Sequence, residues 1–328
     1  MFLSFVGLAA GILLLILGGS LLVRGASEVA ASFGVSPLIV GLTIVGFGTS
    51  SPELMVNIFG ALRGVTDLAF GNVVGSNISN IGLVLGTAAI ILPITIESQV
   101  IRREVPLLIL VTTIMTVMAL DGLLDGEAAY ISRSDGVVLL LLFCIFFYVH
   151  TMDILQVRRG DRISIDIHEN PILESIKVSR FRWLFIVAGF VLLFIGGELT
   201  IRNGMSLAAA LGVSATLVGL FVVAVGTSMP EFATTIVAAV KKEPDLALGN
   251  VIGSNIFNSL IVLPTTALIS EVAVPKGGVT DLLVSWALVA LLVPFFIIGK
   301  ANLTRGAGIF LVVLYVVYVV SRIGMEIG

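Results

Sequence analysis

Two glutamates lie inside long apolar stretches of this 328-residue chain, and each ends the same short motif. Gly-Thr-Ser-Ser-Pro-Glu ends at Glu53, and Gly-Thr-Ser-Met-Pro-Glu ends at Glu231, 178 residues later. A second motif recurs at the same interval, as Gly-Asn-Val-Val-Gly-Ser-Asn at 71–77 and Gly-Asn-Val-Ile-Gly-Ser-Asn at 249–255. A charge at the bilayer centre costs at least about 2.5–3.5 kcal/mol, so such groups face protein or water. A duplicated half that carries one predicts a membrane transporter with a cation site at its internal interface.

Helical spacing gathers oxygen atoms around each glutamate. Thr49, Ser50 and Glu53 are separated by three and four residues, so they share one helix face. Pro52 removes an N–H and clashes with the carbonyl four residues back, which predicts a kink that frees carbonyl oxygens near 46–49. The alternatives are a kink that serves packing and a carboxylate that only hydrogen-bonds neighbouring helices. The corresponding residues of the second motif are Ala224, Thr227, Ser228, Pro230 and Glu231.

The second motif supplies a polar stripe on an apolar helix. Asn72, Ser76 and Asn80 follow one another at intervals of four residues, and Asn77 lies near the edge of their stripe. The glycines of the motif permit close helix approach. Hydrogen bonds between helices are the alternative role for these polar side chains, and the sequence leaves both roles open for Asn72 and Asn77. The repeated set is Asn250, Ser254, Asn255 and Asn258, with glycines at 71, 75, 249 and 253.

All of these side chains offer oxygen, which favours Na⁺, Ca²⁺, K⁺ or H⁺ over zinc or copper. Neither histidine lies on the stripes. Two carboxylates balance one Ca²⁺ or two Na⁺. In an empty site, two negative charges about 4 Å apart repel by ~4 kcal/mol at an effective dielectric of 20. Competition of different cations for one charged site is therefore a basis for exchange.

The composition requires a bilayer as solvent. The chain is 58% hydrophobic and 12% charged, with a mean hydropathy of +1.15, whereas soluble domains are about 25% charged. A net charge of −3 is too small to suggest a nucleic-acid partner. The single cysteine, Cys144, lies in an apolar run and is expected to be buried in packing. Residues 1–22 lack a basic start and a cleavage pattern, so they are expected to form the first span.

The predicted fold class is an all-α integral membrane protein with ten transmembrane helices in two inverted-topology five-helix repeats. Residues 1–152 form the first repeat, with its motif region at 41–86, and 181–328 form the second, with its motif region at 219–264. A charged linker, 153–180, joins them. The predicted spans are 2–23, 35–62, 67–93, 104–121, 132–152, 181–201, 213–240, 245–270, 279–299 and 305–324.

Basic residues predict the orientation. Five spans per half is an odd number, so the halves insert with opposite topology. With the 153–180 linker in the cytoplasm, inside loops hold 13 basic residues and outside loops hold 5. The positive-inside rule favours this arrangement, which places both termini outside a cell membrane.

The paired motifs resemble the two alpha repeats of the sodium/calcium exchanger family, within the cation/calcium exchanger superfamily. The matching segments are 18–86 and 196–264, and the chain resembles prokaryotic members that lack the regulatory domains of animal exchangers. The resemblance implies ten helices and alternating access, with electrogenic entry of three Na⁺ for each Ca²⁺ exported. We further expect the first and sixth spans to slide as a pair against the other helices.

The resemblance also implies ligands. Ca²⁺ would bind Glu53 and Glu231 and the backbone carbonyls of Thr49 and Thr227. Na⁺ would bind Ser50, Ser76, Ser228 and Ser254 and the carbonyls of Gly46 and Ala224. Asn80 and Asn258 match the remaining central positions. Some relatives, potassium-dependent exchangers among them, carry aspartate at one of these positions, so two asparagines argue against potassium dependence.

Three rival functions were weighed against exchange. A Ca²⁺/H⁺ antiporter of the same superfamily is the nearest alternative. An intramembrane hydrolase would need an HExxH pair, an aspartate pair or a serine with a base, and the spans hold none of these arrangements. A passive channel should not bind divalent ions as tightly as two buried carboxylates would. We therefore expect no enzyme activity, no cofactor beyond the transported Na⁺ and Ca²⁺, and no partner beyond these ions and the lipid bilayer.

Overall fold

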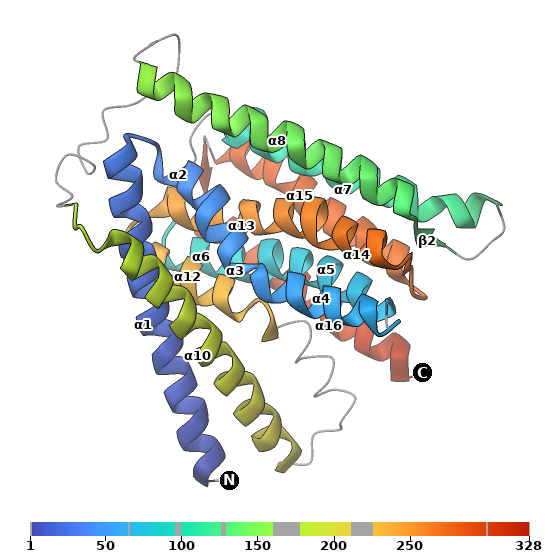
Figure 1. Ribbon diagram of the computed structural model, residues 1–328. Coiled ribbons are helices and arrows are strands. Elements are labelled where there is room, and N and C mark those ends of the chain that lie inside the picture. Colours follow the sequence, from blue (N-terminus) through green and yellow to red (C-terminus); the bar gives the residue numbers. More distant parts are fainter. Residues whose placement is uncertain are drawn as a thin grey trace.

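The computed structural model describes residues 2–64, 66–95, 100–125, 129–159, 178–210, 226–299 and 301–327. Within them the protein is built almost entirely of helices (Figure 1). Eight helices are long and apolar enough to cross a membrane, and a bent pair, 37–49 with 51–62, makes a ninth. Of the seventh predicted span, 213–240, only the second half lies within the described residues, where it forms a helix over Met229–Val240. The protein is therefore a multi-pass membrane protein.

Two long helices, α1 (Phe2–Phe33) and α10 (Arg182–Ala210), lie side by side and extend beyond the other elements (Figure 1). Glycines at intervals of seven residues bring their backbones together. A Cβ on Gly11 would lie 3.0 Å from the carbonyl oxygen of Gly196, and one on Gly18 would lie 2.9 Å from that of Gly189. Residues later in α1 thus contact residues earlier in α10, so the two helices are antiparallel. Small residues at this interface permit the close approach.

The helix that carries Glu53 is broken. It consists of α2 (Pro37–Val40), the π-helical η1 (Gly41–Val45) and α3 (Gly46–Thr49), followed by α4 (Ser51–Leu62). The chain bends by 41° at Ser50, between α3 and α4. Pro52 lies in the first turn of α4, where its missing N–H is tolerated, so the predicted kink is confirmed. In the second half of the chain, α12 (Met229–Val240) begins in the same way, with Pro230 in its first turn.

The helices of the second motif also change winding at matching positions. Helix α5 (Asp67–Ser79) passes into the π-helical η2 (Asn80–Leu85) and α6 (Gly86–Ile91). Helix α13 (Pro244–Phe257) passes into η4 (Asn258–Val262) and α14 (Leu263–Ile269) in the same manner. Both π segments begin at an asparagine of the predicted site, and π segments inside helices are frequent at functional sites.

Outer helices surround these elements. They are η3 (Val100–Glu104), α7 (Val105–Asp125), α8 (Arg133–Arg159), α15 (Gly278–Ile298) and α16 (Arg305–Ile327). Helix α8 packs on α14 and η4, whereas α16 packs on α6 and η2. Four two-residue strands form two antiparallel ladders, β1 with β4 and β2 with β3. The strands are β1 (Ile94–Thr95), β2 (Tyr130–Ile131), β3 (Val272–Ala273) and β4 (Asn302–Leu303).

The prediction that Cys144 is buried is wrong. Its side chain is exposed on α8, as are the neighbouring Leu141 and Ile145, which are 59% and 60% exposed. An apolar run in a membrane protein faces either the core or lipid, and hydrophobicity alone does not distinguish the two environments. Most of the predicted linker lies outside the described residues, and its first part, up to Arg159, continues helix α8.

Candidate ion-binding site

Glu53 and Glu231 are both fully buried, each in the first turn of its helix. Their charges lie close enough to interact. The hydroxyl of Ser50 donates a hydrogen bond of 2.8 Å to Oε1 of Glu231, and Ser254 lies 3.4 Å from the same oxygen. The bend at Ser50 thus aims a hydroxyl of the first motif at the glutamate of the second, so the two motifs meet in one site.

The two glutamates differ from the other buried acids in their surroundings. Glu28 is 2.9 Å from Nε of Arg24, Glu104 is 3.1 Å from Nε2 of His150, and Asp281 is 3.0 Å from Nη2 of Arg322. Among the residues that the structure describes, Glu53 and Glu231 have no such nitrogen partner. A buried ion without a partner is costly, so this pair favours the binding of a cation or of a proton.

Each site threonine is held by an asparagine of the opposite motif. Oγ1 of Thr49 donates to Oδ1 of Asn250 at 3.1 Å, and Oγ1 of Thr227 donates to Oδ1 of Asn72, also at 3.1 Å. The serines lie beside the same hydroxyls, with Ser254 at 3.3 Å from Thr49 and Ser76 at 3.5 Å from Thr227. The asparagine–threonine bonds fix the backbone next to each glutamate.

Asparagines also form hydrogen bonds between η2 and α13 and between η4 and α5. Nδ2 of Asn80 donates to Oδ1 of Asn255 at 3.0 Å, and Nδ2 of Asn258 donates to Oδ1 of Asn77 at 3.3 Å. The side-chain oxygens Oδ1 of Asn80 and Asn258 are buried and accept no hydrogen bond from the described residues. Each amide therefore uses its N–H group in the protein and keeps its oxygen for another ligand. For Asn77 and Asn255, this geometry supports the alternative of bonds between helices.

The site collects buried oxygens that lack a donor among the described residues. They are Oε1 and Oε2 of Glu53, Oε2 of Glu231, Oδ1 of Asn80, Oδ1 of Asn258 and Oγ of Ser228. Native proteins rarely leave such groups unsatisfied, because each costs about 1–3 kcal/mol. A cation that bound these oxygens would remove that cost. The described residues form no group of three His, Cys, Asp or Glu side chains, so hydroxyl, amide and backbone oxygens must complete the ligand set.

Close backbone contact brings Gly46 into the site. Its carbonyl oxygen accepts a hydrogen bond of 3.2 Å from Ser254, and a Cβ on Gly46 would lie 2.9 Å from the backbone of Gly253. A Cβ on Gly249 would lie 2.6 Å from the carbonyl oxygen of Leu38. The predicted role in close helix approach is thus confirmed for Gly249 and Gly253, whereas no described residue lies within 4 Å of a Cβ placed on Gly71 or Gly75. The remaining predicted ligand, Ala224, lies outside the described residues.

Sequence reasoning missed one pair of supporting residues, Asn57 and Thr235. Nδ2 of Asn72 donates to Oδ1 of Asn57 at 2.7 Å, and Nδ2 of Asn250 donates to Oγ1 of Thr235 at 2.9 Å. Both follow their glutamate by four residues, 178 residues apart, on the face that carries the site. That spacing was the available signal, but the two residue types differ, so the repeat comparison did not select them.

The comparison with known families decides what this site belongs to. The model of the family described as sodium/calcium exchanger protein matches residues 3–152 and 181–324, most of the chain. The chain belongs to the sodium/calcium exchanger family.

Relatives and solved structures cover nearly the whole exchanger. It is 28% identical to the sodium/calcium exchanger MaX1 of Methanosarcina acetivorans over 97% of both chains. It is 40% identical to the inner membrane protein YrbG of Escherichia coli, over 80% of this chain and 79% of YrbG. A more distant relative, 24% identical over 70% of this chain and 66% of its own length, is a Ca²⁺/H⁺ antiporter of Aphanothece halophytica. A solved structure of the sodium–calcium exchanger NCX_Mj, soaked with Na⁺ and Ca²⁺, matches with a TM-score of 0.81 at 28% identity, over 98% of this chain and 99% of that one.

Membership accounts for the character of the site. Exchangers are transporters and not enzymes. The family moves cations through the membrane, and in this exchanger Glu53 lies on the bent helix pair 37–49 and 51–62 that is apolar enough to span, while Glu231 lies on the shorter apolar helix Met229–Val240. The chain is thus a cation/Ca²⁺ antiporter by family.

Proposed function

We propose that the protein exchanges Na⁺ for Ca²⁺ by alternating access, with three Na⁺ entering for each Ca²⁺ that leaves. The observation that carries this proposal is the pair of buried glutamates without a basic partner among the described residues, surrounded by unsatisfied oxygens. The names of relatives such as MaX1 and NCX_Mj support Na⁺ as the counter-ion. A cycle of this stoichiometry moves one net charge, worth about 2.3 kcal/mol per 100 mV.

The proposed ligands follow the geometry of the two motifs. Ca²⁺ binds between Glu53 and Glu231, with the backbone carbonyls of Thr49 and Thr227. Na⁺ ions use the hydroxyls of Ser50, Ser76, Ser228 and Ser254, the carbonyls of Gly46 and Ala224, and the side-chain oxygens of Asn80 and Asn258. Support comes from the oxygens that lack donors and from the hydrogen bonds that join the two motifs.

We further propose ten helices in two inverted repeats, 1–152 and 181–328, joined by the 153–180 linker. Contacts between equivalent positions of the two repeats support the inversion, because Gly189 and Gly196 are the residues 178 positions after Gly11 and Gly18. Gly11 meets Gly196 while Gly18 meets Gly189, in an antiparallel pair. The family model matches in two segments with nearly the same limits, 3–152 and 181–324.

Flux of ⁴⁵Ca into proteoliposomes tests the function. Vesicles loaded with Na⁺ and diluted into a Na⁺-free medium should take up ⁴⁵Ca, and an imposed membrane potential should change the rate because the exchange is electrogenic. Glu53→Gln and Glu231→Gln should each abolish uptake, whereas Glu271→Gln, on an exposed loop, should not change it. Uptake by either site variant at the wild-type rate would refute the proposed site.

A Ca²⁺/H⁺ antiporter remains the second candidate, since one relative carries that name. The two functions differ in which gradient drives uptake. If a pH gradient without Na⁺ drives ⁴⁵Ca uptake and a Na⁺ gradient at constant pH does not, the second candidate replaces the first.

A further inference from the structure

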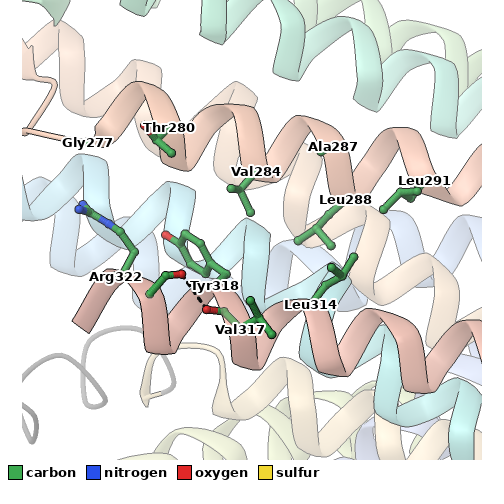
Figure 2. Close-up of a pocket in the computed structure, with 11 residues that line it drawn as sticks. Gly277, Thr280, Val284, Ala287, Leu288, Leu291, Leu314, Val317, Tyr318 and Arg322 are labelled. Carbon is green, nitrogen blue, oxygen red and sulfur yellow. Dashed lines mark hydrogen bonds between the residues drawn. The ribbon is translucent and has the colours of Figure 1, made fainter. Parts of the chain in front are cut away.

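A groove lies between the consecutive helices α15 and α16 (Figure 2). Helix α15 packs on α5 and α7, whereas α16 packs on α6 and η2, so the two helices follow different neighbours and separate. The space between them is a cavity of about 340 Å³, which none of the proposed ion ligands lines. Both helices are candidate membrane spans, and Val317 on the wall of α16 is 58% exposed, so we expect the groove to be accessible from the hydrocarbon of the bilayer.

The groove is apolar for most of its length. Its walls include Val284, Leu288 and Leu291 of α15 and Leu314 and Val317 of α16. Figure 2 shows Leu291 and Leu314 toward one end of the groove and Arg322 at the other end. The lining of α15 extends from residue 280 to residue 291, which is about 16 Å at the rise of an α-helix. That length matches one leaflet, half of a hydrocarbon core of about 30 Å.

The other end of the groove is polar and fixed. Nη2 of Arg322 donates to Oδ2 of Asp281 at 3.0 Å and to the carbonyl oxygen of Lys276 at 3.4 Å. The hydroxyl of Tyr318 donates to Oδ1 of Asp281 at 2.9 Å. The other guanidinium nitrogens of Arg322, Nε and Nη1, have no acceptor in the part of the chain that the structure describes. These bonds hold the guanidinium at the mouth of the groove with N–H donors to spare.

The backbone makes room for this arrangement. Gly277 has a left-handed φ of 82°, and a Cβ at this position would lie 2.7 Å from Nη1 of Arg322. Glycine is the residue that accepts both the conformation and the contact. The exposed ammonium of Lys276 lies on the same loop. Asp281 balances part of the charge of Arg322, and the same loop carries Lys276 together with Glu271, so the cationic group that lines the groove is Arg322.

We propose that this groove binds a phospholipid of the surrounding bilayer, with one acyl chain between α15 and α16 and the phosphate at Arg322. Arginine presents paired N–H groups that match phosphate oxygens, and Tyr318 and Lys276 are residue types that anchor at the membrane interface. The leaflet-length apolar wall and the cationic end together fit an amphipathic occupant with an anionic head. A purely apolar molecule would use the wall but would offer no further acceptor to the guanidinium of Arg322.

Native mass spectrometry of the delipidated full chain tests the proposal. The probes are dioleoyl phosphatidylglycerol and dioleoylglycerol, which share acyl chains but differ in the phosphate. Wild-type protein should bind one phosphatidylglycerol at least fivefold more tightly than dioleoylglycerol. Ala287→Trp, which fills the groove, should abolish that difference in affinity. The matched control, Leu283→Trp, lies on the same helix at an exposed position that does not line the groove, and should bind as wild type does.

The head of the lipid is tested separately. The double variant Arg322→Gln with Asp281→Asn removes both charges together and keeps polar groups that can bond to each other and to Tyr318. It should bind phosphatidylglycerol only as well as dioleoylglycerol. Equal binding of both lipids by wild type, or an unchanged preference in Ala287→Trp, would overturn the proposal. Should Ala287→Trp fail to fold, Val317→Trp on the opposite wall and the double variant decide in its place.

Discussion

The amide side chains at positions 80 and 258 set the charge of the candidate site. Each gives its N–H to another asparagine and keeps a buried oxygen without a donor among the described residues. The site therefore has two carboxylates, and its oxygens can hold a cation without adding a third negative charge. This arrangement matches the charge of one Ca²⁺.

Replacing Asn258 by aspartate should strengthen cation binding. A third carboxylate in the candidate site adds attraction for Ca²⁺, and at a separation of about 4 Å and an effective dielectric of 20 its upper limit for a divalent ion is ~8 kcal/mol. We expect Asn258→Asp to lower the KM for Ca²⁺ by about tenfold and to slow turnover, because tight binding retards release. Initial rates of ⁴⁵Ca uptake measure both quantities, with Asn258→Gln as the neutral control. A KM equal to that of wild type would show that position 258 is remote from the ion.

Thr235 should act on the ion through Asn250 and not by contact. Loss of its hydroxyl leaves an amide N–H of Asn250 without one of its acceptors, which costs about 1–3 kcal/mol. We therefore expect Thr235→Ala to raise the KM for Ca²⁺ several-fold, with Thr235→Ser restoring it because the hydroxyl returns. A purely structural role would instead lower the amount of folded protein in both variants alike, which size-exclusion chromatography of the purified protein detects.

The sequence could predict which residues surround the two glutamates but not the residues that support them. Glu53, Thr49 and Ser50 can be recognised because their types repeat and their spacing places them on one face. Asn57 and Thr235 each accept a hydrogen bond from a motif asparagine, but they are different residue types, so a search for identical residues in the two repeats does not reveal them. The environment of Cys144 could not be predicted either, since lipid and a protein core select the same side chains.

At the scale of elements, the bend was predictable and the π segments were not. Proline in a helix interior removes a hydrogen bond and clashes with the carbonyl four residues back, and the bend lies at Ser50, two residues before Pro52. No residue type dictates a π turn, which depends on what packs against the helix. In η2, a Cβ on Gly82 would lie 2.8 Å from Cβ of Tyr315 in α16. The winding of η2 is thus adapted to a helix that lies far away in the sequence.

The pair α1 and α10 should move together against α12 and its neighbours. A Cβ on Gly19 would lie 3.2 Å from a side-chain carbon of Val237 in α12, within reach of a disulfide. In a Cys144→Ser background, oxidised Gly19→Cys with Val237→Cys should lose ⁴⁵Ca exchange and regain it on reduction. The matched control links the moving pair within itself, through Ser4→Cys with Ser206→Cys, whose hydroxyls are 3.1 Å apart. Exchange that survives the first crosslink would refute a sliding pair.

The loop between α12 and α13 joins α1 at the membrane edge and should give the fold a pH dependence. Nζ of Lys241 donates to the carbonyl oxygen of Ser20 at 2.7 Å. Burial raises the pKa of Glu243, and its contacts with Ser27 and Lys241 lower the pKa by less. The folded protein thus holds this proton more tightly than the unfolded chain does. The contribution of Glu243 to stability is therefore largest below its unfolded pKa, near 4.3, and falls as the pH rises through its folded pKa.

The substitution Glu243→Gln should remove the loss of stability that Glu243 causes as the pH rises. We expect the fall in Tm between pH 5 and pH 8 to be smaller in Glu243→Gln than in wild type, measured by thermal unfolding in detergent. Glu271→Gln, at an exposed position, is the control and should leave the difference in Tm unchanged. A steeper fall in Glu243→Gln would mean that the carboxylate is stabilised, and not penalised, where it lies.

At the scale of the whole molecule, the orientation in the membrane follows from charge. Basic residues resist transfer across the bilayer, so loops that hold them stay in the cytoplasm. The 13 basic residues assigned to the inside against 5 outside include Arg102 and Arg103 at the start of α7 and Lys241 and Lys242 between α12 and α13. A fold of two inverted repeats could insert either way, and we propose that this difference in charge selects the direction.

Reporter fusions should therefore place both termini outside. Alkaline phosphatase, which is active only after export, should be active when fused after Gly328, and a green fluorescent protein at the same position should be dark. The same reporters inserted between Arg162 and Lys177 should give the opposite result, because that segment is predicted to stay in the cytoplasm. Moving charge should then weaken the preference: Arg102→Ser with Arg103→Ser, combined with added lysines after residue 328, should yield a mixed population. An active phosphatase in the linker of the unaltered chain would reverse the assignment and, with it, the side from which Ca²⁺ is exported.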